Sequence, residues 1–92
     1  MIKTFRHRGL ERLFEEGDRS KIRAEQVSRI LDVLAHLDQA VTPSDLNLPG
    51  YRLHRLKGDR KGTWSVTISG NWRITFRFEN GDGFAVNLVD YH

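Results

Sequence analysis

Two short stretches of the chain carry the side chains best suited to acid–base chemistry. His54 lies within a basic stretch, Arg52–Lys57. The chain ends in an acid, a phenol and an imidazole, at Asp90, Tyr91 and His92. An imidazole titrates near pH 6.5, so it can act as an acid or as a base at neutral pH. Strand alternation would place Asp90 and His92 on one side of the chain and Tyr91 on the other.

Positive charge is concentrated in the same half of the chain as these groups. Residues 1–50 carry eight Lys or Arg and eight Asp or Glu, so the net charge of +3 comes wholly from residues 51–92. Such an excess is typical either of a solvated sheet face or of a site that binds phosphates. The stretch 51–77 has a charge of +6, from the single acid Asp59 and from seven bases: Arg52, Arg55, Lys57, Arg60, Lys61, Arg73 and Arg77.

These groups together suit the cleavage of RNA by its own 2′-hydroxyl. That reaction needs a base for the attacking hydroxyl, an acid for the 5′-oxygen, and cations for the charge that develops on the phosphate. We expect the acid and the base to come from His54 and the last three residues, with charge from Lys57 and Arg73. A structural histidine at position 54 and a frayed, inactive chain end are alternatives that spacing alone leaves open.

Neither a metal nor a cofactor is expected. The chain has no cysteine, which excludes disulfides and thiolate metal sites. A metal site formed by His54, Asp90 and His92 is conceivable, but the surrounding positive charge would oppose a cation. No apolar run approaches the roughly 20 residues of a membrane span, and no signal-peptide pattern opens the chain, so a cytoplasmic protein without membrane contact is expected.

The elements that must position these residues can be inferred from hydrophobic periodicity. Ninety-two residues predict a single domain, 1–92, because domains usually run about 50–250 residues. Apolar residues recur at helical spacing over Gly9–Glu16 and over Lys21–Asp38. Gly17 would end the first helix, and Asp18 or Ser20 would cap the second.

After residue 50 the apolar period changes from 3.6 to 2, which is typical of strands with one buried face. The order β-α-α-β-β-β-β then predicts an α+β domain, in which two N-terminal helices pack on one face of a mainly antiparallel sheet. The expected strands are 2–5, 51–57, 64–69, 72–79 and 84–89.

One hairpin allows a register prediction. Pairing Ile68 with Trp72 keeps apolar residues opposite each other and requires a three-residue loop, 69–71. Arg73 and Arg77 then share the polar face, about 13 Å apart. Asn71 is either a turn residue or a reader of adenine, whose two edge atoms an Asn amide can pair.

The motifs that follow have a more specific pattern. Several stretches of the chain resemble the HigB toxins of the RelE/ParE superfamily. They are residues 56–66 (LKGDRKGTWSV), residues 70–78 (GNWRITFRF), the ending VDYH, and the opening IKTF together with GLE at 9–11. The similarity extends over essentially the whole chain. One departure is Ala85, where relatives often carry an acid before the valine; we expect little effect on chemistry because Ala85 would face away from the core.

The resemblance implies a RelE-like microbial RNase toxin fold and a toxin of a type II toxin–antitoxin pair. Such toxins are metal-independent mRNA interferases that cleave mRNA in the ribosomal A site, against 16S ribosomal RNA, and a helix-turn-helix antitoxin neutralises them. The resemblance assigns catalysis to His54, Lys57, Asp90, Tyr91 and His92. RNA binding is expected from the neighbouring cations and the turn amide: Arg55, Arg60, Lys61, Asn71, Arg73 and Arg77.

Two alternative functions remain open from the sequence. A gyrase-poisoning toxin on the same fold would not need the acid–base tail 90–92, so the ending argues against it. A non-catalytic basic module that binds RNA or DNA would explain the charge without any chemistry. It would keep its binding if an acid–base residue were replaced, whereas the nuclease would lose cleavage.

Overall fold

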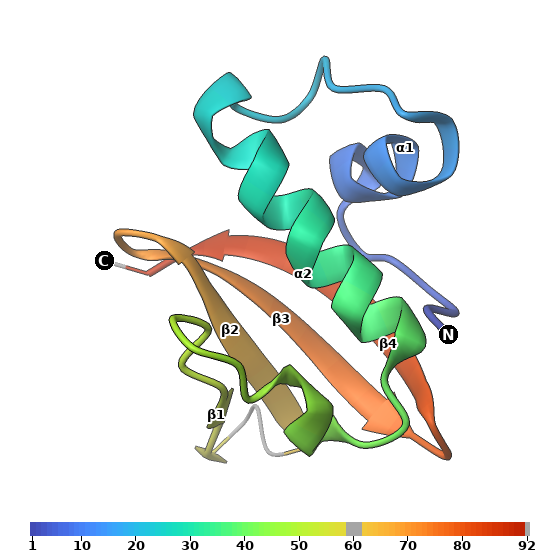
Figure 1. The fold of residues 1–92 in the computed structure, drawn as a ribbon, viewed down its shortest axis with the longest axis vertical. Helices are drawn as coiled ribbons and strands as arrows, with labels where there is room; N and C mark the ends of the chain where they lie inside the picture. The colour runs from blue at the N-terminus through green and yellow to red at the C-terminus, as the bar shows by residue number, and fades with distance from the viewer. Residues whose placement is uncertain (59–61, 92) are drawn as a thin grey trace.

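Residues 1–58 and 62–91, the part of the chain that the computed structural model describes, form two α-helices and a four-stranded antiparallel sheet. The sheet order follows the chain order, β1-β2-β3-β4, and α2 lies diagonally across the sheet (Figure 1). This confirms the predicted α+β class. The elements are α1 (Arg8–Glu16), α2 (Val27–Gln39), β1 (His54–Arg55), β2 (Thr63–Ser69), β3 (Trp72–Glu79) and β4 (Asp82–Asp90), with 3₁₀ turns η1 (Ala24–Gln26) and η2 (Pro43–Leu46).

Helix α1 follows its prediction closely at both ends. The Nδ1 atom of His7 accepts a hydrogen bond from the backbone N–H of Leu10 at 3.1 Å and so caps the helix start. Gly17 ends the helix with φ +72°, a left-handed conformation that glycine adopts without steric cost. Leu10 and Leu13 are buried beneath the helix, as the apolar spacing indicates.

Helix α2 begins later than predicted, at Val27 instead of Lys21. Neither expected cap is used, because the Asp18 carboxylate accepts a hydrogen bond from the Ser20 N–H at 2.9 Å and closes a local turn. The chain then passes through η1 before the helix starts.

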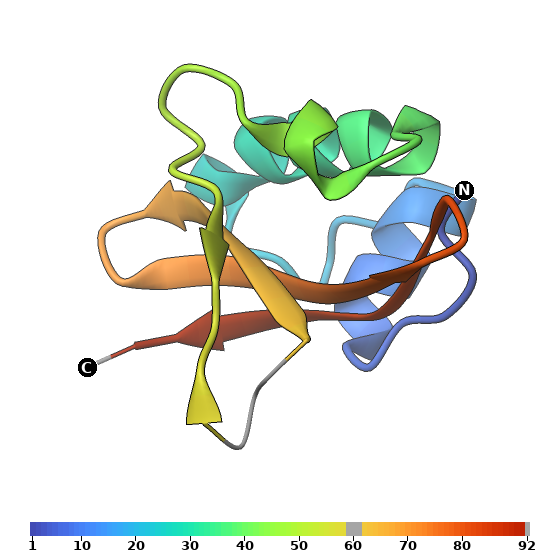
Figure 2. The same cartoon turned by 90° about the horizontal axis from the view of Figure 1, so that it is seen from below.

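The hydrophobic core lies between α2 and one face of the sheet. Figure 2 shows α2 on one side of the sheet, and among residues 1–58 and 62–91 no helix lies over the opposite face of the central strands. The innermost side chains come from both layers, and they include Ile30, Val33, Leu34 and Leu37 from α2 and Val66, Ile74, Phe76 and Val86 from the strands. Among the described residues, no helix is long and apolar enough to cross a membrane.

The hairpin between β2 and β3 corrects the predicted loop. Ser69 pairs with Trp72 across a two-residue turn, Gly70–Asn71, so the pairing of Ile68 with Trp72 is wrong. A β-bulge at Ile68 absorbs the extra residue and restores the expected pairs further along the strands. Ile68 therefore stays buried although the turn is shorter than predicted.

The two expected outer strands are shorter than predicted. The segment 2–5 forms only isolated parallel bridges to β4, from Ile2 to Gly83 and from Phe5 to Val86. The segment 51–57 pairs with β2 only at 54–55, in a stretch interrupted by Arg52 at φ +49°. The left-handed backbone at Arg52 interrupts the regular ladder, which leaves one hydrogen bond from Thr67 to the Tyr51 carbonyl before it and the paired residues 54–55 after it.

A second bulge, in β4, joins the N-terminal segment to the sheet. Phe76 of β3 faces two residues of β4 here, Ala85 and Val86, and Ala85 takes φ +53°. The twist turns the Ala85 N–H toward Thr4 Oγ1 at 2.7 Å, and the Val86 N–H toward the Thr4 carbonyl at 3.1 Å. An L-residue in this conformation costs about 1–2 kcal/mol.

Replacement of Ala85 by glycine should therefore stabilise the protein. Glycine removes the left-handed strain but loses more backbone entropy on folding, which leaves a net gain of about 0.5–1 kcal/mol in the free energy of unfolding. Urea denaturation measures the change. The same substitution at Ala35, exposed on α2, should instead cost about 1 kcal/mol. Destabilisation by Ala85→Gly would contradict the assigned backbone strain.

Candidate active site on the helix-free face

A shallow hollow of about 430 Å³ lies on the sheet face opposite to α2. It brings together three residues from distant parts of the sequence that were predicted to act in catalysis or RNA binding: His54, Arg73 and Tyr91. The described residues that line it carry cations and hydroxyls but no acid. They are Arg52, Leu53, His54, Leu56, Ser65, Thr67, Arg73 and Tyr91.

The position of His54 is set by the edge of the sheet. It lies opposite Ser65 in the β1–β2 ladder, whereas the next residue, Arg55, lies opposite Trp64. The Arg55 guanidinium carbon stands 5.4 Å from the centre of the Trp64 ring, on the other face of the sheet. Alternation therefore presents His54 to the hollow and directs Arg55 away from it.

The segment before His54 is fixed from the helix layer by Arg29 of α2. One Nη atom donates to the Gly50 carbonyl at 2.7 Å and to the Thr67 carbonyl at 3.2 Å. The guanidinium also lies 4.5 Å from the ring centre of Tyr51, which is buried. The Tyr51 carbonyl accepts in turn from the Thr67 N–H at 2.7 Å, so helix, loop and β2 are held together.

The Tyr51 hydroxyl completes this attachment on the far side of the ring. It donates to Asp32 Oδ2 at 3.4 Å and lies 3.1 Å from Nδ1 of His36. Burial raises the pKa of the Tyr51 phenol, and the nearby Asp32 carboxylate raises it further. The phenol therefore remains protonated at neutral pH and keeps its role as a donor.

The other half of the hollow is held by the turn Gly70–Asn71. Arg73 Nη1 donates to the Gly70 carbonyl at 2.8 Å and to the Trp72 carbonyl at 3.1 Å. The Tyr91 N–H donates to the Asn71 carbonyl at 2.9 Å. One hairpin turn therefore fixes both the cation of β3 and the end of β4 at the hollow.

Other predicted site residues lie outside this hollow. Asp90 pairs with Trp72, so the register puts it on the side opposite to Tyr91, as the tail alternation predicts. Lys57 is exposed beyond the end of β1, and Asn71 is exposed in the hairpin turn. Arg77 shares the face of Arg73 but lies four residues along β3, about 13 Å away. Arg60, Lys61 and His92 lie outside the described residues.

Some lining residues were not predicted as site residues. Arg52 was counted only as part of the general charge, although its spacing of two from His54 could have indicated a shared face. Ser65 and Thr67 also line the hollow, with Ser65 buried, because strand alternation puts them on the face of Arg73. Leu53 and Leu56 supply apolar walls, and nothing in the alternation indicates that role.

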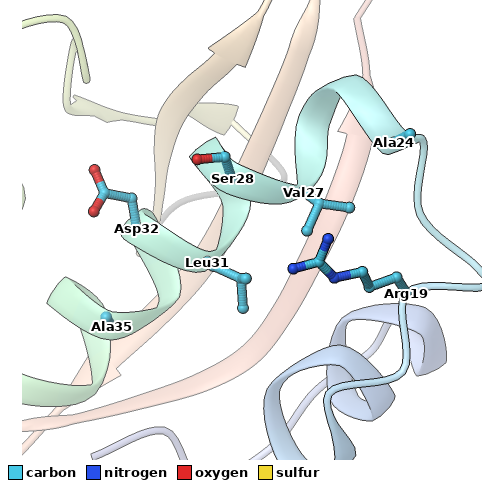
Figure 3. Close-up of a pocket in the computed structure, with 7 residues that line it drawn as sticks. All are labelled: Arg19, Ala24, Val27, Ser28, Leu31, Asp32 and Ala35. Atoms are coloured by element: carbon cyan, nitrogen blue, oxygen red, sulfur yellow. The ribbon is translucent and has the colours of Figure 1, made fainter.

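A further hollow, of about 380 Å³, opens on the outer side of α2. Figure 3 shows the Arg19 side chain extending toward Leu31 and Val27 of the helix there. No predicted site residue lines it. This separates it from the candidate active site.

Comparison with known proteins identifies the class. Residues 3–92 match the model of a family described as the RelE-like toxin of type II toxin–antitoxin system HigB. The chain is 52% identical to endoribonuclease HigB of Proteus vulgaris over 92 residues, with both chains fully covered. It is 32% identical to toxin HigB-1 of Vibrio cholerae over 95 residues, which cover 100% of this chain and 98% of that protein.

A solved structure supports the same fold. The crystal structure of a point mutant of YafQ from E. coli aligns with a TM-score of 0.60, covering 98% of this chain and 91% of the other at 13% identity. Fold and family together define a RelE-like toxin of a type II toxin–antitoxin system. Within that class the chain belongs to the HigB toxin family. A type II system pairs its toxin with an antitoxin partner.

Replacement of Arg29 by methionine should loosen the attachment of the His54 segment. The variant loses two charge-assisted hydrogen bonds, but it also removes the Nε atom, which is buried and has no hydrogen-bond partner among the described residues. We expect a loss of about 1–2 kcal/mol in the free energy of unfolding, measured by urea denaturation. Arg19→Met, at an exposed arginine, should change stability by no more than about 0.5 kcal/mol. Equal effects of the two substitutions would contradict the attachment.

Proposed function

We propose that this toxin is an endoribonuclease that cleaves mRNA in the ribosomal A site and so inhibits translation. The observation that carries the proposal is the convergence of His54, Arg73 and Tyr91 in one hollow that the described residues leave without an acid. A relative with 52% identity over the full chain bears the name endoribonuclease, which supports the same activity.

The proposed reaction is attack by the 2′-hydroxyl on the adjacent phosphorus. The bond from the 2′-oxygen to phosphorus forms, and the bond from phosphorus to the 5′-oxygen breaks. A base on the protein takes the 2′-hydroxyl proton, and an acid gives a proton to the leaving 5′-oxygen. The products are a 2′,3′-cyclic phosphate and a 5′-hydroxyl, and no metal-activated water takes part.

The hollow offers groups for each of these tasks. The His54 imidazole can serve as the acid or the base, and the Tyr91 phenol is a second proton donor at the same hollow. Arg73 and Arg52 would stabilise the charge that develops on the phosphate oxygens. We retain Lys57, Asp90 and His92 as further catalytic groups, and Arg55, Arg60, Lys61, Asn71 and Arg77 as RNA-binding ones.

The openness of the hollow is the reason for assigning the substrate to the ribosome. An isolated nuclease needs a cleft that holds a flexible RNA strand in the geometry for in-line attack. The described residues form only a shallow surface hollow at this face. The A site, with its 16S ribosomal RNA, would hold the mRNA and complete the site. We propose a cytoplasmic protein in which residues 1–92 form one toxin domain, neutralised by a helix-turn-helix antitoxin.

Replacement of His54 by glutamine tests the proposed chemistry. Glutamine keeps a hydrogen-bonding side chain but cannot transfer a proton at neutral pH, so cleavage in translating extracts should fall by about 10²–10⁴-fold. Mapping of transcript ends gives both the rate and the end groups, and wild type should leave cyclic or 3′-phosphate ends. Glu25→Gln, at an exposed residue of η1, should keep near-normal cleavage.

Several outcomes would count against the nuclease. Ends bearing a 5′-phosphate would indicate a metal-activated water. Full toxicity of the His54→Gln variant, with unchanged RNA binding, would favour the non-catalytic binding module. Arrest of replication while translation continues would favour the gyrase-poisoning alternative.

Replacement of Asn71 by alanine separates base reading from the turn. The carbonyl that accepts the Tyr91 N–H belongs to the backbone and is kept in the variant. If the exposed amide reads adenine, its loss should relax sequence preference by about 1–3 kcal/mol at one position while cleavage continues. Sequencing of the transcript ends measures this preference, with Asn47→Ala at an exposed loop position as the control. An unchanged cleavage pattern would leave Asn71 as a turn residue only.

A further inference from the structure

A row of polar residues runs across the sheet on the face of the candidate active site. His54 pairs with Ser65, Ser65 pairs with Thr75, and Thr75 pairs with Asn87, so each strand contributes one residue. Directly paired residues share a face of the sheet, with Cβ atoms about 4.5–5.5 Å apart. The row therefore places the Ser65 side chain beside that of His54.

Two members of this row are buried although their side chains are polar. Ser65 and Thr75 are each 3% exposed, and the third buried polar residue of the described chain is Gln26. The Gln26 amide has a partner, because its Nε2 atom donates to Ser69 Oγ at 3.3 Å. Between described residues, by contrast, no hydrogen bond uses the Ser65 hydroxyl. An unpaired hydroxyl at a buried position needs an explanation.

The Ser65 hydroxyl opens into the hollow. Its neighbours in β2, Trp64 and Val66, lie on the core side of the strand. Among the described residues only the Arg29 Nε atom is sealed from solvent without a hydrogen-bond partner, so the unpaired oxygen of Ser65 keeps contact with the solvent of the hollow. The other described lining residues are half-buried or exposed. Ser65 therefore forms the floor.

The floor lies between the groups proposed for proton transfer and for charge. His54 stands directly opposite Ser65 in the β1–β2 ladder. On the other side, Arg73 pairs with Thr67, two residues along β2 from Ser65. Such a diagonal neighbour on one face lies about 7–8 Å away. A phosphate that is in reach of both His54 and Arg73 would therefore lie over Ser65.

Part of the Arg73 guanidinium is already engaged. Its Nη1 atom donates to the Gly70 carbonyl at 2.8 Å and to the Trp72 carbonyl at 3.1 Å. In-line attack gives a pentacoordinate phosphorus whose nonbridging oxygens gain negative charge, and each of them needs hydrogen-bond donors. A second donor that is close to Arg73 but fixed independently of it would share this task. Ser65, held in the β2–β3 ladder, has the position and the hydroxyl for it.

We propose that Ser65 is a further catalytic residue, whose hydroxyl donates a hydrogen bond to a nonbridging oxygen of the scissile phosphate; the inference rests on the nuclease activity proposed above. The hydroxyl keeps its proton throughout, and the bonds that form and break are those of attack by the 2′-oxygen. A donor fixed in advance stabilises the transition state more than the ground state, because the charge on the oxygen develops during attack.

Replacement of Ser65 by alanine tests this role. Single-turnover cleavage of mRNA on purified ribosomes, over a range of toxin concentrations, gives the rate at saturation and the half-saturating concentration separately. The rate at saturation should fall by about 10²-fold, as is typical for the loss of one donor to a developing oxyanion. The half-saturating concentration should change by less than about threefold, because the hydroxyl acts in the transition state.

Thr75→Val is the matched control. It removes a hydroxyl that is as buried as that of Ser65 but belongs to a residue outside the lining of the hollow. It should keep the rate at saturation within about threefold of wild type. Urea denaturation of both variants separates a loss of stability from a loss of catalysis.

Two further substitutions at position 65 examine the hydroxyl itself. Ser65→Thr keeps a hydroxyl and should recover most of the rate that Ser65→Ala loses. Ser65→Cys keeps nearly the volume of serine but offers only a weak donor, so it should be as slow as the alanine variant. It serves as the test if Ser65→Ala fails to fold.

The outcomes separate this role from the proposed activity. Equal losses of rate in Ser65→Ala and Thr75→Val would overturn it, and so would a higher half-saturating concentration at an unchanged saturating rate. Full activity of Ser65→Ala, with His54→Gln inactive, would overturn the role of Ser65 and leave the nuclease intact. Full activity of both variants would overturn the proposed chemistry together with its further residue.

Discussion

The guanidinium group of Arg29 ties the segment that carries His54 to the helix layer, in addition to backbone hydrogen bonds to β2 from Tyr51 and Leu56. This segment pairs with the sheet over only two residues, 54 and 55, so ladder hydrogen bonds alone hold it weakly. Arg29 projects from the buried helix layer and binds carbonyls of the loop and of β2, and it stacks on Tyr51. The helix layer on one face of the sheet therefore determines where a side chain stands on the other face. A lysine would not be equivalent, because it lacks the planar guanidinium that lies over the Tyr51 ring while one of its nitrogens bonds both carbonyls.

The opposite half of the hollow needs no such support. Arg73 and Tyr91 are both bonded to carbonyls of the turn Gly70–Asn71, which is local to β3 and adjacent to the end of β4. The bulge at Ile68 makes this arrangement possible, because it lets a tight two-residue turn coexist with a continuous apolar face. The candidate site thus has two halves. The β2–β3 hairpin positions Arg73 and Tyr91, whereas the half that contains His54 is attached to helix α2.

Periodicity predicted the architecture because burial of an apolar face sets both helical and strand spacing. The stripe of α2 and the alternation in β2 to β4 follow from that one requirement, whereas the stop at Gly17 follows from the left-handed backbone that glycine allows. The two bulges were not predictable in the same way. At Ile68 and Ala85 an extra residue is accommodated by local backbone geometry, while the apolar pattern on both sides of it stays unchanged. The short pairing of 51–57 was missed for a related reason, since Arg52 gives no sign in its type that its backbone is left-handed.

For the candidate site, too, the sequence predicted some of the residues, and only the structure showed the others. His54, Arg73 and Tyr91 line one hollow, so the structure brings together two positions predicted for catalysis and one cation predicted for RNA binding. Family membership confirms the resemblance that motifs such as GNWRITFRF indicated. Arg52 was not predicted as a site residue because it is one of seven bases in the stretch 51–77. A second basic hollow, at the start of α1, could not be found by counting, because the acids that balance it in sequence lie on another side of the helix. Its bases are Arg6, Arg8, Arg12 and Lys21.

The separation of charge is an argument about function in its own right. Like charges held close together repel, and a domain of 92 residues has little stability to spare for that cost. Both basic hollows nevertheless lack an acid among their described lining residues, and each includes a residue of the chain 87–91 at the end of β4. A rigid, extended polyanion relieves the repulsion at both places at once, whereas a single small anion would relieve only one.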